Sequence, residues 1–134
     1  MKIIDASVAL KWFVNEPAGQ KTAEQVLQQV ESDPRLFGVP ELFFAEMLHV
    51  LCRIFKEEKR VKEAMTILET LGFERIGFGH ELLQLATGIS LKYEISGYDA
   101  IYVASAKLLK GQWYTFDQKA HQKINKLNVS TLLC

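Results

Sequence analysis

Cysteine is scarce in this sequence, and neither sign of charge is in excess. The only two cysteines, Cys52 and Cys134, are far apart and match no metal-binding spacing, which favours a reduced, cytoplasmic setting. Sixteen basic residues balance sixteen acidic residues. A protein that coats nucleic acid needs a basic excess, so any contact with nucleic acid is expected to be confined to a local groove.

Several other features are missing, and each absence counts against a class of protein. No segment approaches the roughly 20 apolar residues of a membrane-spanning helix. The short apolar run near the N-terminus is interrupted by Asp5, which argues against a signal peptide. There is no glycine-rich loop of the GxGxxG or Walker A type, which argues against a nucleotide-binding α/β domain. The three histidines are scattered and form no zinc spacing.

The chain does contain a regular alternation of short apolar segments and helical segments. Its 134 residues are enough for one domain with one core, and 49% of them are hydrophobic. Strands are predicted at residues 2–5, 36–39, 73–78, 112–116 and 129–133. Helices are predicted at residues 6–14, 18–29, 40–60, 61–71, 80–93, 97–109 and 118–125, with Pro40 as the first residue of the long one. This alternation predicts an α/β sandwich with a mainly parallel sheet, in a single domain over residues 1–134.

Only four aspartates occur in the chain, and three of them lie among apolar residues. Asp5 and Asp117 follow the strand-like runs KII and WYTF, whereas Asp99 precedes the apolar helix AIYVA. Ligands of parallel sheets bind beyond the carboxyl ends of the strands, so Asp5 and Asp117 are expected at the same edge if their strands are adjacent. The sequence leaves Asp99 open, because a helix that leads into the later strand could begin near the opposite edge.

Glu46 is a fourth acid in apolar surroundings. It lies in the stretch ELFFAEMLHVL, one helical turn from Leu42 and Val50, and it is too deep in the helix to cap it. Burying an unpaired carboxylate costs several kcal/mol, so a buried Glu46 needs a partner. That partner could be a metal ion or a base such as Arg53, or the side chain could be partly exposed.

Four carboxylates in one site would repel each other and raise each other's pKa values. A divalent cation removes this difficulty, since Mg²⁺ and Mn²⁺ prefer oxygen ligands and retain several waters. Such a site can activate a water molecule and hold a phosphate oxygen. Each aspartate also has a structural explanation, because Asp5 and Asp117 could cap the helices that follow them and Asp99 could form a capping box with Ser96.

Four segments together resemble the PIN-domain family, and within it the VapC-type toxins of prokaryotic toxin–antitoxin pairs. The segments are IIDASVALKWF, VPELFFAEMLHVL, ISGYDAIYVASAK and YTFDQKAH. They follow the family's order and spacing, and the similarity covers essentially the whole chain. The resemblance implies a Mg²⁺- or Mn²⁺-dependent ribonuclease with a three-layer α/β/α sandwich.

The resemblance also implies which residues form the site. Six residues match the family's site positions: the acids Asp5, Glu46, Asp99 and Asp117, and the small hydroxyl residues Ser7 and Thr115. In this family the helix that carries Asp99 brings its acid to the shared site. Many relatives have Asn where this chain has His49, so no role is assigned to that residue. Homodimers are implied, as is a small antitoxin whose tail fills the active-site groove and whose other end binds operator DNA.

Two further groups of side chains could contact RNA. The basic candidates for phosphate binding are Lys11, Arg53, Lys92 and Lys107. The aromatic candidates for base stacking are Trp12, Tyr98, Tyr102 and Trp113. Isolated lysines are more often solvated, and aromatic residues at these spacings more often belong to the core or a dimer contact, so both explanations stay open.

Taken with the resemblance, the sequence predicts a cytoplasmic, metal-dependent endoribonuclease. It would be the toxin of a type II toxin–antitoxin pair and would hydrolyse RNA phosphodiesters with a metal-activated water. Two alternatives stay open. One is a nuclease of the same fold that acts in RNA processing or DNA repair without an antitoxin. The other is a non-catalytic binding module that has kept the fold.

Overall fold

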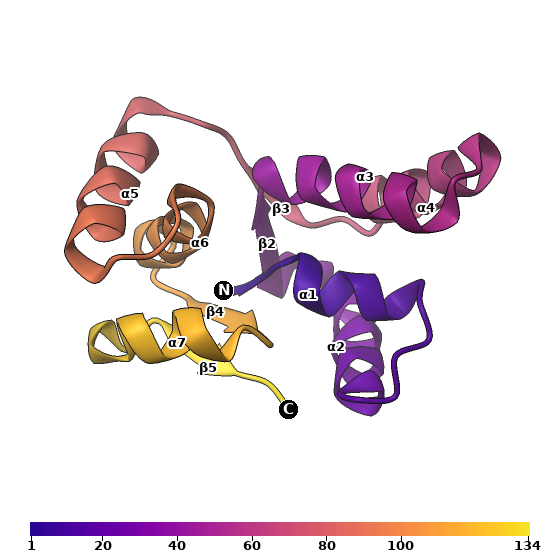
Figure 1. Ribbon diagram of the computed structural model, residues 1–134, viewed down its shortest axis with the longest axis horizontal. Coiled ribbons are helices and arrows are strands. Elements are labelled where there is room, and N and C mark those ends of the chain that lie inside the picture. The colour runs from indigo at the N-terminus through magenta and orange to yellow at the C-terminus, as the bar shows by residue number, and fades with distance from the viewer.

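The computed structural model describes residues 1–134 and is built around a five-stranded sheet (Figure 1). All strands are parallel, in the order β3-β2-β1-β4-β5. Their bounds are β1 (Lys2–Ile4), β2 (Phe37–Pro40), β3 (Glu74–Ile76), β4 (Gln112–Thr115) and β5 (Ser130–Leu132). Every predicted strand is therefore present, and each begins and ends within two residues of its predicted position.

Helices cover both faces of the sheet and produce the three-layer α/β/α architecture. The chain adds β2 and β3 on one side of β1, then returns to add β4 and β5 on the other. Right-handed crossovers place the helices of these two halves on opposite faces, and Figure 1 shows α1 to α4 on one side of the sheet and α5 to α7 on the other. The α/β fold with a parallel sheet is thus confirmed.

The helices of the first half are α1 (Ala6–Ala9), α2 (Gln20–Ser32), α3 (Leu42–Phe55) and α4 (Glu58–Thr70). Those of the second half are α5 (His80–Tyr93), α6 (Gly97–Leu108) and α7 (Gln118–Ile124). Three short 3-10 turns are η1 (Leu10–Trp12), η2 (Pro34–Leu36) and η3 (Asn125–Leu127). None of the helices has the length and apolar character that a membrane crossing requires.

The core lies on both faces of the central strand. Successive side chains of a strand point to opposite faces, and both Ile3 and Ile4 of β1 are fully buried. A strand that is apolar on both faces is typical of a parallel sheet covered by two helical layers. Trp113 of the neighbouring strand β4 and Tyr102 of α6 are among the largest fully buried side chains.

Two predicted boundaries of the long helix were wrong because of local backbone geometry. Pro40 does not open the helix but ends β2, and the next residue, Glu41, donates its backbone N–H to Ile76 of β3 at 2.8 Å. The helix was also predicted to continue through residues 56–60. It ends at Phe55, because Lys56 adopts a left-handed conformation with φ of +53°. The charged run therefore spans the turn and the first turn of α4.

The prediction for the first helix also fails in part. The first helix was predicted over residues 6–14, but only Ala6–Ala9 are α-helical, and the backbone then tightens into the 3-10 turn Leu10–Trp12. On α4, Ala64 and Leu68 are buried and face the core, whereas Ile67 is 50% exposed.

Gly111 allows β4 to lie close to β1, which gives a test of the central packing. A Cβ on Gly111 would overlap the carbonyl group of Met1, whose oxygen accepts the backbone N–H of Gln112 at 3.0 Å. We therefore expect Gly111→Ala to lower the free energy of unfolding by about 1–3 kcal/mol. Gly88→Ala is the control, because a Cβ at this helical position meets open space and should raise stability by up to about 1 kcal/mol. Urea denaturation measures both variants, and equal effects would contradict this packing.

Candidate active site

The carboxyl ends of β1 and β4 form the point at which the strand order reverses. From β1 the chain moves to β2 on one side, while β4 adjoins β1 on the other. Ligands of open parallel sheets bind in the crevice at such a point. Asp5 directly follows β1, and Asp117 lies two residues beyond the end of β4, with Ile4 paired to Tyr114 in the register. The structure thus places Asp5 and Asp117 at the same edge.

Asp5 is buried, and both of its carboxylate oxygens accept hydrogen bonds. Oδ1 accepts from the backbone N–H of Ser7 at 2.9 Å and from the Ser7 hydroxyl, and Oδ2 accepts from the indole N–H of Trp113 at 2.9 Å. The bond to the Ser7 backbone caps α1, so the structural explanation for Asp5 holds as well. Burial raises the pKa of Asp5, while the hydroxyls of Ser7 and Thr115 and the indole of Trp113 oppose that rise.

Ser7 and Thr115 connect the two strand ends that carry these acids. Their hydroxyl oxygens lie 3.5 Å apart. The Ser7 hydroxyl accepts the backbone N–H of Phe116 at 3.1 Å, and the Thr115 hydroxyl accepts the backbone N–H of Asp117 at 3.0 Å. Because these bonds hold the backbone just after β4, the two hydroxyl residues determine where Asp117 lies relative to Asp5.

Glu46 has a partner that the sequence did not reveal. Its side chain is half-buried, and its Oε1 accepts a hydrogen bond from the hydroxyl of Tyr102 at 2.6 Å. Arg53, the base considered as a partner, is exposed and makes no ion pair with Glu46. Burial raises the pKa of Glu46, the Tyr102 hydroxyl opposes this, and the negative charges of Asp5 and Asp99 raise it further.

Tyr102 itself is suited to act as a permanent donor. It is almost fully buried in α6, and burial together with the charge of Glu46 raises the pKa of its hydroxyl well above the ordinary value. The phenol therefore stays protonated at neutral pH and donates to the carboxylate. From the sequence, Tyr102 and Trp113 were candidates only for base stacking or for packing in the core or a dimer contact. The feature that could have indicated their role is the polar group on each ring, the hydroxyl of Tyr102 and the indole N–H of Trp113. A buried tyrosine or tryptophan needs a hydrogen-bond partner for this group.

Asp99 reaches the same edge because α6 runs antiparallel to β4. The far end of α6 leads to Gly111, which packs against Met1 at the amino ends of the strands. The first turn of α6, with Asp99, therefore lies toward their carboxyl ends. Burial raises the pKa of Asp99, and the charges of Asp117 and Asp5 raise it further. The possibility that this helix begins at the opposite edge is thus excluded.

The capping explanations for the two later aspartates hold in part. The Ser96 hydroxyl accepts the backbone N–H of Asp99 at 3.0 Å, which is one half of the capping box considered for this helix. Asp117 is exposed, and its carboxylate accepts the backbone N–H of Ala120 at 3.0 Å and caps α7. Capping fixes the direction of Asp117 without removing its charge.

These four acids form a patch of negative charge that has no basic partner. The ion pairs of the protein lie elsewhere and join Lys11 to Glu16, Arg35 to Asp33, Lys62 to Glu58 and Arg75 to Glu41. No three of the acidic, histidine or cysteine side chains converge into a ready-made metal cluster. Mg²⁺ often needs only one or two carboxylates because it retains several waters. The chemistry of these uncompensated carboxylate oxygens therefore fits a hydrated divalent cation.

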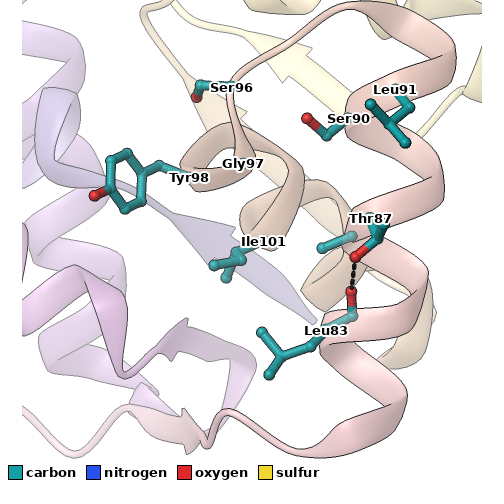
Figure 2. Close-up of a pocket in the computed structure, with 9 residues that line it drawn as sticks. Leu83, Thr87, Ser90, Leu91, Ser96, Gly97, Tyr98 and Ile101 are labelled. Atoms are coloured by element: carbon teal, nitrogen blue, oxygen red, sulfur yellow. Dashed lines mark hydrogen bonds between the residues drawn. The ribbon is translucent and has the colours of Figure 1, made fainter.

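Two hollows lie beside this patch. One of about 420 Å³ opens next to Glu46 and is lined by Ala6, Leu42, Ala45, Glu46, His49, Val50 and Tyr98. The other, of about 500 Å³, lies between α5 and α6 (Figure 2) and contains none of the four acids. Tyr98 lines both, and Figure 2 shows its ring extending from the start of α6 away from α5. The smaller hollow is the one that adjoins the candidate chemistry.

The candidate RNA contacts fall into two groups. Lys11 is buried and pairs with Glu16 at 2.9 Å, and Trp12 donates its indole N–H to the carbonyl of Ala23 at 2.8 Å, so both are tied into the fold. Tyr98 is 64% exposed beside the acids. The remaining basic candidates on the surface are Arg53, Lys92 and Lys107.

Comparison with known proteins gives one family and a set of similar folds. The sequence matches the model of the PIN domain family over residues 2–127. No curated protein matches it. The structure is similar to a chain of a toxin-antitoxin complex from Klebsiella pneumoniae, with a TM-score of 0.70, 17% identity, and coverage of 98% of this chain and 96% of that one. It is also similar to a chain of FitAcB from Neisseria gonorrhoeae, with a TM-score of 0.71, 15% identity, and coverage of 93% and 94%.

Burial of Asp99, together with repulsion within the acidic patch, predicts how stability depends on pH. Because the pKa of Asp99 is raised above its ordinary value of 3.8, the folded state loses stability as pH rises from that value through the raised pKa. Asp99→Asn has no carboxyl group at this position to ionise, so it does not lose this stability as pH rises. Its melting temperature in EDTA should therefore exceed that of the parent at pH 7 and equal it at pH 3.

A control variant and a measurement with added divalent cation complete this test. Asp33→Asn changes the same chemical group outside the patch, beside Arg35, and should give no gain at pH 7. Divalent cation at about ten times its Kd should stabilise the parent by roughly 1.4 kcal/mol and Asp99→Asn by less. If Asp99→Asn melts at the same temperature as the parent at both pH values, burial and repulsion do not raise the pKa of Asp99 as described.

Proposed function

The chain belongs to the PIN domain family, and from this premise we propose that it is a Mg²⁺- or Mn²⁺-dependent endoribonuclease. The main support is the acidic patch at the carboxyl edge of the sheet, where Asp5, Glu46, Asp99 and Asp117 lie without a basic partner. The reaction would be hydrolysis of an RNA phosphodiester. The fold supports a crevice site at this place, and the donor set is all oxygen, as these cations prefer.

The four acids and the two hydroxyl residues of the site would have different roles. Asp5, Asp99 and Asp117 would hold the cation, directly or through water, and Glu46 would hold it or orient the attacking water. The bound cation would lower the pKa of a water molecule and neutralise charge on a phosphate oxygen. Ser7 and Thr115 would keep Asp5 and Asp117 in place through the hydrogen bonds between the two strand ends.

Glu46 is the acid best suited to receive a proton. Its Oε1 is occupied by the Tyr102 hydroxyl, which leaves Oε2 free. A carboxylate with a raised pKa is a better base at neutral pH than an ordinary one. In the proposed reaction the water oxygen bonds to phosphorus, its proton passes to Oε2 of Glu46, and the bond from phosphorus to the leaving oxygen breaks. The leaving oxygen then takes up a proton from solvent.

We further propose that the chain is the cytoplasmic toxin of a type II toxin–antitoxin pair and that a small antitoxin neutralises it. This is supported by the similar fold in the toxin-antitoxin complex from Klebsiella pneumoniae. A nuclease that acts in RNA processing or DNA repair without an antitoxin is the alternative within the same chemistry. A small antitoxin gene beside the gene for this chain would distinguish them. A non-catalytic binding module is disfavoured, because such a module has no need to keep four acids in one patch.

The nuclease activity gives the first functional prediction. The purified protein should cleave a pool of structured RNA with Mg²⁺ or Mn²⁺ and should stop when EDTA is added. Asp5→Asn and Glu46→Gln should each lower the rate by about 10²–10⁴-fold, because they remove a ligand or a base at the reacting centre. Gel analysis of a time course measures the rates, and circular dichroism checks that the variants fold.

Glu63→Gln is the matched control, because Glu63 is an exposed glutamate of α4 outside the acidic patch. It should cleave like the parent. Were Asp5→Asn and Glu46→Gln to cleave equally well, the activity would belong to a contaminant or to another site. No cleavage by the parent with either metal would remove RNA hydrolysis from the proposal.

A homodimer is proposed for the apolar surface around the hollow between α5 and α6. Leu91 is 78% exposed there, and it lines the same hollow as the exposed Leu83 and Tyr98 (Figure 2). Leu91→Lys should convert a dimer into a monomer in sedimentation velocity at about 50 µM, since burying an unpaired lysine is unfavourable. Gln84→Lys places the same charge on α5 outside that hollow and should leave the dimer intact. A monomeric parent would contradict the dimer and leave the nuclease proposal unchanged.

A further inference from the structure

Two buried aromatic side chains end on acids of the candidate site. Trp113 of β4 is fully buried, and its indole N–H donates to Oδ2 of Asp5 at 2.9 Å. Tyr102 of α6 is 1% exposed, and its hydroxyl donates to Oε1 of Glu46 at 2.6 Å. The two rings are stacked on each other, with centroids 5.8 Å apart and planes inclined by 14°. A continuous chain of contacts therefore runs from Asp5 through both rings to Glu46.

Ordinary packing does not require this arrangement. A buried indole needs a hydrogen-bond acceptor, and a backbone carbonyl is sufficient, as Trp12 shows by donating to Ala23. Trp113 and Tyr102 instead donate to carboxylates. Hydrogen bonds to an ionised group are about twice as strong as neutral ones, so they restrict the orientation of the acceptor more tightly. The bond from Tyr102 to Glu46, at 2.6 Å, is also short.

The two donors complete the restraint of the acids. Oδ1 of Asp5 is held by Ser7, and the indole holds Oδ2, which fixes the plane of the carboxylate. Glu46 is held only through Oε1, which accepts the bond from Tyr102. This bond sets the orientation of the carboxylate and leaves Oε2 free to react. Asp5 follows β1 and Glu46 lies in α3, so the two acids belong to different parts of the fold. The stacked rings of Trp113 in β4 and Tyr102 in α6 connect them.

We propose that the stacked Trp113–Tyr102 pair is a positioning unit that holds Asp5 and Glu46 at the separation the divalent cation and the attacking water require. This rests on the proposed function and concerns the same site. Neither ring touches the reacting atoms, so both are positioning residues. Because the rings are in contact, loss of one hydrogen bond should disturb the acid held by the other.

Metal affinity is the first measurement. Trp113→Phe and Tyr102→Phe keep an aromatic ring and remove the donor, and each should weaken Mn²⁺ binding about 10–100-fold in calorimetry of the purified protein. In the double variant the loss should be smaller than the product of the two single losses, since the pair acts as one unit. Trp12→Phe is the matched control. It loses one indole hydrogen bond to a backbone carbonyl and should bind Mn²⁺ like the parent.

The indole resonance of Trp113 gives a readout that is independent of activity. The chain has two tryptophans, so a ¹⁵N-labelled sample gives two indole N–H signals, and the spectrum of Trp113→Phe assigns them. Addition of Mg²⁺ should shift the Trp113 signal and leave the Trp12 signal unchanged, and Asp5→Asn should abolish the shift. Tyr102→Phe should move the Trp113 signal without any metal, because it releases the stacked ring.

The outcomes separate this inference from the proposed function. If Trp12→Phe and Trp113→Phe lower the melting temperature alike but only Trp113→Phe weakens Mn²⁺ binding, the role is positioning and not general stability. If the parent binds Mn²⁺ and both ring variants bind it equally well, the inference is overturned while the metal site stands. If the parent binds no Mn²⁺, the inference and the metal-dependent function both fail.

Discussion

A buried carboxylate at the end of the central strand places the strictest demand on this structure. Asp5 lies between the two layers of the core, where an unsatisfied charge would cost several kcal/mol. Its donors lie at very different distances along the chain, with Ser7 only two residues away and Trp113 on the neighbouring strand. The small hydroxyl after the strand, the tryptophan within β4 and the close contact of β1 with β4 are therefore parts of one requirement.

The same site opposes the stability of the fold. Glu46 and Asp99 have raised pKa values because burial and neighbouring negative charges act together on them. No lysine or arginine relieves that repulsion, although the chain has sixteen basic residues. Natural sequences break local rules of this kind mainly at functional sites. The chain belongs to the PIN domain family, and a cation that relieved this repulsion would account for the unfavourable arrangement, as in the metal-dependent nuclease that we propose.

Secondary structure brings the acids together through the direction of the elements. Parallel strands place the residues after β1 and β4 at one edge, and a helix that returns antiparallel to them begins at that edge with Asp99. Glu46 enters from α3 on the opposite helical layer, and Tyr102 from α6 meets it across the crevice. Both helical layers thus contribute to the site, so it depends on the assembled sandwich and on no single motif.

The sequence by itself determined the elements and the local positions of the acids. Alternating short apolar runs and helical periods predicted all five strands, and Asp5 and Asp117 could be placed at strand ends because that relation spans only a few residues. The break at Lys56 had no comparable signal, since lysine rarely adopts a positive φ. The residue pattern left the position of Asp99 open, only the family resemblance implied it, and the tertiary structure places the start of α6 at the shared edge. Tertiary structure alone decided that Glu46 pairs with Tyr102 and that Trp113 holds Asp5. These last two contacts join residues 56 and 108 positions apart, and no local pattern records which distant donor a buried carboxylate meets when the layers close.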